Sequence, residues 1–435
     1  MTSVAEVRLW GSLIGAVAYS DGDVAASFQY SPEFLDSGIE LSPLMMPLAA
    51  AVYRFPELSH RSFHGLPGLL ADSLPDTFGN AVINAWLASE GRHNDSLNPV
   101  ERLCYTGTRG MGALEFAPIM GPTATSSSRV YVDRLVELAT DVLAHRDNLE
   151  VSFKDAEKAE ALRDILRVST SAGGARAKAV VAWNENTNEV RSGQVEAKAG
   201  FSDWVLKFDG VGRNRDKEMA DPEGYGAIEY AYHKMAVDAG IEMAECRLLE
   251  ENGRRHFMTK RFDRTADGDK VHMQSLGGLA HFDYNEAGLY SYEQALGIIR
   301  RLELGIDAIE AQFRRMAFNI IARNQDDHVK NIAFLMDRRG RWMLAPAFDV
   351  TYAFQPQGLW TSRHQMTMNG KQDNFSLDDF RACARHGGMK RGRAEDIVET
   401  VRRVVSGWQD YADAVRVDPA HRDRIQNALR IDPFR

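Results

Sequence analysis

Hydrophobic and polar positions follow a strand-like pattern near the beginning of this chain and a helical pattern near its end. Residues 8–10 with 13–19, and then residues 24–30, are rich in β-forming side chains and flank the turn dipeptide Asp21-Gly22. We expect the first two segments to form one strand and residues 24–30 to form its partner. The pattern therefore predicts a β-rich start.

The middle of the chain contains both strand-like and helical patterns. Residues 179–183 and 204–208 cluster β-formers, and residues 229–239 have helical spacing. The segments 246–249 and 256–262 flank Asn252-Gly253, a dipeptide that favours a tight hairpin turn.

Beyond residue 264 the helical period dominates, because amphipathic segments surround one short hairpin. The predicted helices are 292–301, 308–322, 394–408 and 422–429, and the hairpin joins 332–336 to 342–344. We thus expect an α+β chain with a bilobal, protein-kinase-like fold. Its predicted parts are a β-rich N-terminal subdomain (1–135), an N-lobe (136–260) and a mostly helical C-lobe (261–435).

Composition narrows the possible functions. The chain has 435 residues, 44% of them hydrophobic and 26% charged, which is enough for more than one core. Its formal net charge of -9 argues against stand-alone nucleic-acid binding, which needs a basic surface. Cys104, Cys246 and Cys383 form neither a disulfide framework nor a metal-ligand spacing. No run of about 18 apolar residues occurs, so we expect no membrane span and a cytoplasmic protein.

The strongest chemical signal is the segment 324–331, Asn-Gln-Asp-Asp-His-Val-Lys-Asn, which is followed by a hairpin and Asp349. Protein kinases carry their base and a metal-binding Asn in an Asp-x-x-x-x-Asn loop, with a second metal-binding Asp after a short hairpin. Asp326 and Asn331 have that spacing. We therefore predict Asp326 as the catalytic base and Asn331 and Asp349 as Mg²⁺ ligands. The alternative is a polar loop and an unrelated aspartate.

Two upstream segments could hold phosphates. Small residues precede Lys178 and would let backbone N–H groups approach a phosphate, although a flexible turn is the alternative. Lys207 is a single charge within the apolar string WVLKF, and could face a nucleotide or be a snorkelling edge-strand residue. Lys260, Arg261 and Phe262 would connect the lobes, with backbone groups near adenine and Phe262 as an apolar contact.

These strings together resemble the HipA family of serine/threonine kinase toxins. The supporting strings are LPDTFGN, SAGGARAK, WVLKF, KRFDR, FNIIARNQDDHVKNIAF and WMLAPAFDVTYAF. The resemblance implies that Asp326 is catalytic, that Asp349 binds metal, that Ser171 is autophosphorylated and that the cofactors are ATP and Mg²⁺. It also implies nucleotide contacts from two loops, the connector and a strand: Gly173, Gly174, Ala175, Arg176, Ala177, Lys178, Lys207, Lys260, Arg261, Phe262, His328, Val329, Lys330 and Asn331.

The same resemblance implies partners. The protein substrate would be an aminoacyl-tRNA synthetase, most of all the glutamyl enzyme, and a HipB-type helix-turn-helix antitoxin would bring the protein to operator DNA. The connector begins with Lys260, where family members often have Glu, and Ser169 and Thr170 are alternative sites of modification. A small-molecule or lipid kinase, and a catalytically weak corepressor, remain alternative functions.

Overall fold

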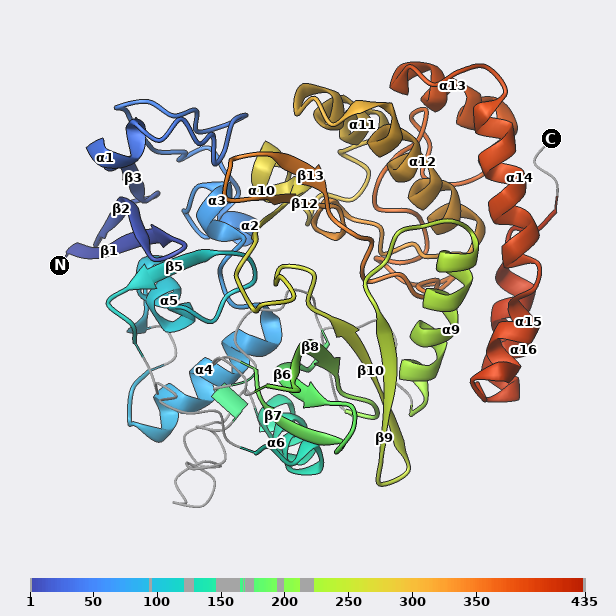
Figure 1. Cartoon of the computed structure of the whole chain (residues 1–435), viewed down its shortest axis with the longest axis horizontal. Helices are drawn as coiled ribbons and strands as arrows, with labels where there is room; N and C mark the ends of the chain where they lie inside the picture. Colours follow the sequence, from blue (N-terminus) through green and yellow to red (C-terminus); the bar gives the residue numbers. More distant parts are fainter. Residues whose placement is uncertain are drawn as a thin grey trace. The chain divides into compact units, whose positions relative to one another are not determined.

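The computed structural model describes residues 2–93, 96–120, 129–145, 165–166, 168, 176–193, 199–211 and 223–432. The chain forms two compact units, each assembled from separate segments (Figure 1). Unit 1 comprises Met1–Glu223, Leu249–Gln274 and Leu335–Arg341, and unit 2 comprises Gly224–Leu248, Ser275–Phe334 and Trp342–Arg435. The expected α+β class is confirmed, whereas the three-part division by residue number stays a prediction.

The first sheet of unit 1 is antiparallel, with strand order β4-β3-β2-β1-β5. Its strands are β1 (Thr2–Leu9), β2 (Ser12–Ser20), β3 (Ser27–Tyr30), β4 (Val52–Tyr53) and β5 (Leu114–Ala117). Short helices accompany it: α1 (Pro32–Leu35), α2 (His60–Phe63), α3 (Gly68–Ala71) and α5 (Pro99–Thr106). A capping box between Asn98 and Glu101 starts α5.

One strand expectation was wrong. Residues 8–10 and 13–19 do not form a single strand, because the chain turns at Trp10 and Gly11 and β1 pairs with β2 as a hairpin. Both turn residues have positive φ (50° and 81°), the backbone of a two-residue hairpin turn. The partner strand expected over 24–30 is present as β3.

The second sheet of unit 1 has the order β7-β6-β8-β10-β9. Its strands are β6 (Lys178–Asn184), β7 (Glu189–Ser192), β8 (Ser202–Lys207), β9 (Cys246–Glu251) and β10 (Arg254–Lys260). The predicted turn at Asn252 and Gly253 is confirmed, with φ values of 48° and 79°. Helices α4 (Thr77–Ser89) and α6 (Val132–His145) contribute Val82 and Val142 to one apolar core with Leu206 of β8.

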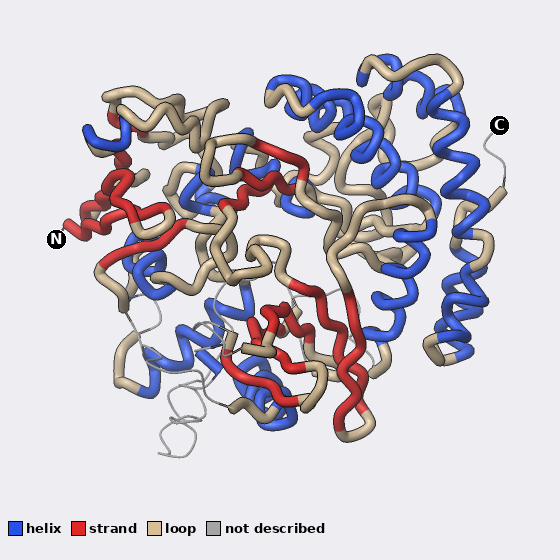
Figure 2. Tube along the Cα trace, in the orientation of Figure 1, coloured by secondary structure: helices blue, strands red, loops and turns tan. Residues whose placement is uncertain are grey.

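Helices dominate unit 2 (Figure 2). They are α9 (Tyr225–Asp238), α10 (Leu276–Ala280), α11 (Tyr292–Arg301), α12 (Gly305–Ile321), α13 (Leu377–Gly387), α14 (Arg393–Val405), α15 (Trp408–Ala414) and α16 (Pro419–Ala428), with the 3₁₀ turn η2 (Val329–Asn331). The third sheet has the order β11-β12-β13, formed by β11 (His272–Ser275), β12 (Ala333–Met336) and β13 (Trp342–Leu344).

The core of unit 2 forms around α12, which packs against α11 and α14. Phe313 and Phe318 of α12 are fully buried, and Tyr232 of α9 donates a hydrogen bond of 2.7 Å to the Ala322 carbonyl at the end of α12. This packing fixes the point at which the polar segment after α12 begins. Within the described ranges, no helix has both the length and the apolar character of a membrane span.

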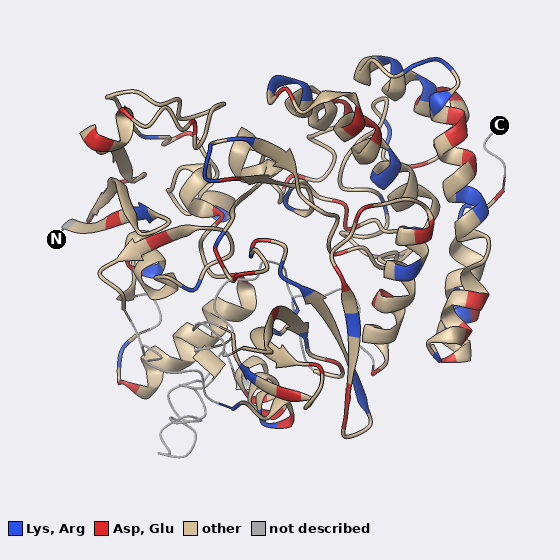
Figure 3. Ribbon diagram, in the orientation of Figure 1, with Lys and Arg blue, Asp and Glu red and all other residues tan. Residues whose placement is uncertain are grey.

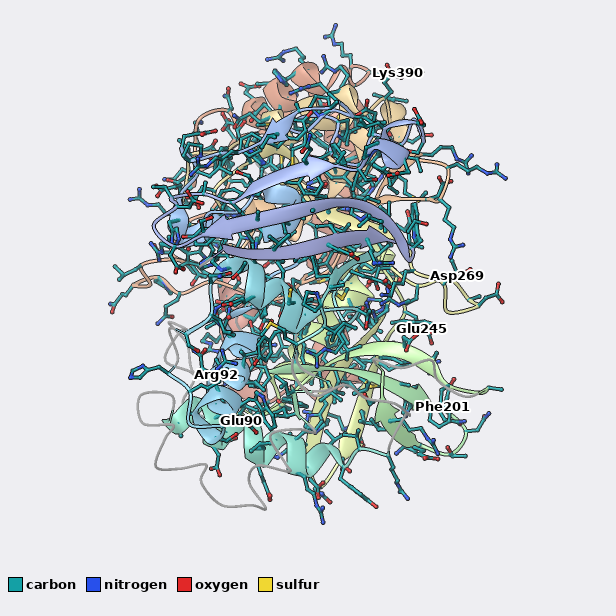
Figure 4. All side chains as sticks on the ribbon, turned by 90° about the vertical axis from the view of Figure 1, so that its left-hand side faces the viewer. Glu90, Arg92, Phe201, Glu245, Asp269 and Lys390 are labelled. Atoms are coloured by element: carbon teal, nitrogen blue, oxygen red, sulfur yellow. The ribbon has the colours of Figure 1, made fainter. Side chains whose placement is uncertain are left out.

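Acidic and basic positions both occur along α13 and α14 (Figure 3). Lys390, in the turn between these helices, projects from the surface (Figure 4). Several of these charges form local ion pairs, such as Arg381 with Glu395 at 2.8 Å. Such exposed pairs contribute little to stability.

Candidate functional site

The segment after α12 and the segment after β13 lie side by side in unit 2. Asn324 forms a parallel bridge with Ala353, and the Gln325 amide donates a hydrogen bond of 3.0 Å to the Ala353 carbonyl. Asp326 and Asp349, 23 positions apart in the sequence, therefore belong to adjoining segments. The segments that carry the predicted base and the predicted metal ligand therefore adjoin, and the roles of the two residues stay predictions.

Asp326 is held from two sides. The Asn331 side-chain amide donates a hydrogen bond of 2.7 Å to the Asp326 carbonyl, which closes the loop across the predicted spacing. Trp360 donates its indole N–H to Asp326 Oδ1 at 2.7 Å, and His328 Nε2 lies 3.8 Å from the same oxygen. The Asp326 side chain remains 44% exposed, so its carboxylate can meet an external hydroxyl group.

Asn331 and Asp349 fit a magnesium ion by their chemistry. The amide nitrogen of Asn331 is engaged by Asp326, so its carbonyl oxygen is the end that can face a cation. Asp349 has a positive φ of 52°, and its carbonyl accepts a hydrogen bond of 3.4 Å from Asn324. Among the described residues there is no cluster of three or more His, Cys, Asp or Glu side chains that could hold a metal. A two-ligand oxygen site completed by phosphates is the arrangement that Mg²⁺ commonly takes.

The residues between Asp326 and Asn331 have different surroundings. His328 precedes η2 as its N-cap residue, and its ring centroid lies 5.8 Å from that of Tyr284. Val329 is buried in the core, and Lys330 places its ammonium 4.6 Å from the Tyr284 ring. A nucleotide contact from Val329 would therefore come from its backbone.

Two buried lysines face each other in unit 1. Lys178 on β6 and Lys207 on β8 are register partners, and only 3% and 8% of these residues is exposed. Directly opposed residues of an antiparallel pair share one face, where like charges repel. Asp76, the N-cap residue of α4, lies 3.7 Å from the Lys178 ammonium, and Lys207 lies 5.6 Å from the Phe257 ring centroid. Two neighbouring buried cations suit a multiply charged anion.

The predicted connector follows directly from β10. Lys260 is exposed, and its ammonium lies 6.0 Å from the ring of its cross-strand partner Trp204. Phe262 is half-buried.

Arg261 makes its contacts inside unit 1. Its amide donates a hydrogen bond of 2.9 Å to the Asp203 carbonyl, and its guanidinium forms two hydrogen bonds with Asp263, at 2.9 and 2.7 Å. Burial opposes ionisation of Asp263, but Arg261, Arg264 and the Gly112 amide lower its pKa to about 2. The Arg261 carbonyl is the group that remains for the predicted adenine contact.

The small-residue loop is described only at its end. The Ala177 carbonyl accepts a hydrogen bond of 3.0 Å from the Phe208 amide, which extends the β6–β8 pairing, and Arg176 is half-buried. The other predicted loop residues lie outside the described residues: Ser169, Thr170, Ser171, Gly173, Gly174 and Ala175.

Sequence reasoning missed four residues around the predicted site. Trp360 carries no sequence signal, because it lies 34 positions from Asp326 in a loop. Asp327 and His364 form a buried pair at 2.7 Å. The Asp-Asp doublet at 326 and 327 draws attention to Asp327, but nothing in the sequence points to His364 as its partner. Asp76 stands in the LPDTFGN string, where its helix-capping position was recognisable but its contact with Lys178 was not.

Comparison with known protein families gives two matches that together cover most of the chain. A model of the HipA-like C-terminal domain matches residues 170–408, more than half of the chain, and a model of the HipA N-terminal domain matches residues 5–117. The C-terminal match contains every predicted site residue other than Ser169.

Individual relatives are more distant. A protein of Sinorhizobium fredii named "Putative kinase Y4mE" is 25% identical over 209 residues, which are 42% of this chain. The match spans about half of that relative, 48% of its length. A chain in the structure of the Shewanella oneidensis MR-1 toxin–antitoxin complex of HipA, HipB and operator DNA has a TM-score of 0.66 at 16% identity. The likeness covers 98% of this chain and 96% of that chain, so the two share a fold.

Proposed function

The chain belongs to the HipA family, and on this premise we propose that it is an ATP- and Mg²⁺-dependent kinase that phosphorylates a protein serine or threonine. The observation that carries the proposal is the pair of buried lysines at opposed positions of β6 and β8. A buried charge needs a compensating partner, and Asp76 supplies one negative charge near Lys178. The phosphates of a nucleotide are multiply charged anions that two such cations could bind together.

Each predicted side chain then has a defined task. Lys178 and Lys207 bind phosphate oxygens, while Asn331 and Asp349 would hold Mg²⁺ through oxygen atoms. When bound, the metal neutralises charge on the transferred phosphoryl group. Asp326 orients the acceptor hydroxyl and accepts its proton.

Nucleotide recognition would use mainly backbone groups. Lys260, Arg261 and Phe262 supply carbonyl groups and one half-buried ring at the end of β10. His328, Val329 and Lys330 contribute from the catalytic loop, and residues 173–178 from the small-residue loop. The side chains of Arg261 and Val329 are buried within their own units, which supports backbone contact at both positions.

We infer the partners from the family. A HipB-type antitoxin would bind the protein and bring it to operator DNA, as the matched Shewanella oneidensis MR-1 complex contains HipA, HipB and operator DNA. The proposed substrate is an aminoacyl-tRNA synthetase, with the glutamyl enzyme first to be tested. The half-exposed Asp326 carboxylate supports an acceptor that arrives from solvent.

Self-modification of Ser171 is part of the proposal. A phosphate there would add about −1.5 to −2 charges close in sequence to Lys178 and would compete with the nucleotide for cationic groups. We expect phosphorylated protein to bind ATP more weakly than unmodified protein. Mass spectrometry of Ser171→Ala, beside Ser169→Ala and Thr170→Ala, would identify the modified residue. Equal ATP affinity of both forms would contradict the inhibitory role.

The proposed function is tested by phosphate transfer from radiolabelled ATP. Asp326→Ala should lower the rate about 100- to 10,000-fold, because a general base is lost, while ATP affinity changes little. Asp410→Ala, at an exposed position of α15, is the matched control and should retain activity. Similar rates for wild type and Asp326→Ala would remove this residue from the mechanism. Transfer to small molecules but to no protein would refute the protein-kinase assignment.

A further inference from the structure

The segment from Trp360 to Gln365 contacts both acidic residues of the catalytic loop. Trp360 donates its indole N–H to Asp326 Oδ1, and the Gln365 amide donates to Asp327 Oδ1, each at 2.7 Å. His364 Nδ1 lies 2.7 Å from Asp327 Oδ2. The Gln365 side chain also donates to the Trp360 carbonyl, which ties the two ends of the segment together. All of these residues belong to unit 2.

Asp327 anchors the loop from its buried side. Its side chain is 1% exposed, and it also accepts a hydrogen bond of 2.6 Å from the Tyr292 hydroxyl of α11. Burial would raise the pKa of Asp327, but His364, Tyr292 and the Gln365 amide lower it, so the carboxylate stays charged. An ionised group with three such donors has little freedom to move.

The proton on His364 is fixed by its other neighbour. Arg430 Nη1 lies 3.1 Å from His364 Nε2, and a guanidinium can only donate. Nε2 is therefore the acceptor, and Nδ1 carries the proton given to Asp327. The Arg430 amide donates a hydrogen bond of 2.9 Å to the Ile321 carbonyl at the end of α12, which holds this support in place.

Asp326 is thereby presented on a fixed backbone with one oxygen already occupied. An indole N–H is a donor only, so Trp360 cannot take a proton from an acceptor hydroxyl. Within the described residues, the donors that contact the Asp326 carboxylate lie at Oδ1 and none lies at Oδ2. The side chain of Asp326 keeps its 44% exposure despite the contact with Trp360. Leu359, beside Trp360, is fully exposed.

We propose that Trp360 is a positioning residue for catalysis: it holds Oδ1 of Asp326 so that Oδ2 faces the acceptor hydroxyl. This inference rests on the proposed kinase function. In the step, the hydroxyl proton passes to Oδ2 while the hydroxyl oxygen bonds to the γ-phosphorus. The bond from that phosphorus to the β–γ bridging oxygen breaks, and ADP leaves. Without the indole N–H, the carboxylate rotates among several orientations and fewer of them are productive.

The test compares Trp360→Phe with wild type in steady-state phosphate transfer. The phenyl ring keeps the apolar contacts and removes the N–H, so we expect kcat to fall about 10- to 100-fold. The KM for ATP should stay within about twofold, and Tm should change little. Trp360→His, which restores a ring N–H, should recover part of the lost kcat. Trp342→Phe, the same change on β13, is the matched control and should keep wild-type kcat.

A second measurement detects the contact between Trp360 and Asp326 without enzyme turnover. The indole N–H signal that disappears from the NMR spectrum of Trp360→Phe identifies Trp360, and this signal should shift in Asp326→Asn. No shift in Asp326→Asn would overturn the inference, as would unchanged kcat in Trp360→Phe. A rise in the KM for ATP as large as the fall in kcat would also refute it, because that result indicates a general structural role.

These results separate the inference from the proposed function. Active wild type with inactive Asp326→Ala and fully active Trp360→Phe refutes only the role of Trp360. Wild type that transfers no phosphate to any protein, itself included, refutes both.

Discussion

The carboxylate of Asp327 lies 2.7 Å from Nδ1 of His364, and both side chains are buried in unit 2. The two residues are 37 positions apart, and one of them directly follows the predicted catalytic base. Because Nδ1 of His364 donates to the Asp327 carboxylate, the contact is a buried, charge-assisted hydrogen bond. Because Asp327 directly follows Asp326, this contact also fixes the backbone of the catalytic loop.

Removing His364 should destabilise unit 2. His364→Ala leaves the buried Asp327 carboxylate without one of its three hydrogen-bond donors, and we expect the free energy of unfolding to fall by about 1.5–3 kcal/mol. His364→Asn keeps an N–H donor and should recover part of this loss. His386→Ala, at an exposed position of α13, serves as control and should stay within about 0.5 kcal/mol of wild type in denaturant unfolding. Equal effects at the two histidines would contradict the structural role of the pair.

Asp263 should make unit 1 sensitive to acid. Its pKa lies at about 2, below the ordinary value of an aspartate, so the folded state binds its proton less readily than the unfolded state. The associated stability, about 2 kcal/mol, is fully present above pH 4 and is lost as the pH falls from about 4 to 2.

Asp263→Asn is the variant that tests this pH dependence. We expect it to be less stable than wild type at neutral pH and to lose less stability on acidification, as measured by urea unfolding across pH. Asp269→Asn is the control, because the Asp269 side chain is 60% exposed and pairs with Arg338 at the surface. Parallel pH curves for wild type and Asp263→Asn would show that another group is responsible.

Lys207→Met should weaken ATP binding. Loss of a phosphate partner should lower the affinity about thirtyfold, which corresponds to about 2 kcal/mol. Calorimetry with ATP measures this effect, and thermal unfolding without ATP shows that the variant still folds. Lys234→Met, at an exposed position of α9, should leave the affinity unchanged.

Asn98→Ala should remove the cap of α5. The Asn98 side chain accepts a hydrogen bond of 3.0 Å from the Glu101 amide, and the Glu101 carboxylate accepts one of 2.9 Å from the Asn98 amide. We expect a loss of about 1 kcal/mol in the free energy of unfolding. Asn186→Ala, at an exposed turn position, should be nearly neutral. A comparable loss at Asn186 would show that the cap itself contributes little.

Local pattern predicted much of this fold correctly. The Asn252-Gly253 hairpin and the helices α11, α12, α14 and α16 were predicted, because turn dipeptides and helical periodicity act over a few residues. The same reasoning failed at Trp10 and Gly11, where two β-forming segments looked continuous although the backbone turns between them. The Asp-x-x-x-x-Asn spacing of Asp326 and Asn331 was also local, since their hydrogen bond closes within one loop.

The sequence by itself thus determined the α+β class, the family and the catalytic-loop spacing, because these depend on short-range patterns and on motif strings. Only the tertiary structure decided that Lys178 stands opposite Lys207, that Trp360 holds Asp326 and that His364 pairs with Asp327. Strand register and loop-to-loop contacts depend on how distant segments pack, and a one-residue slip of β6 against β8 would turn one lysine to the other face. The physical reason is that the spacing of residues along the chain does not specify which distant side chains will share a buried environment.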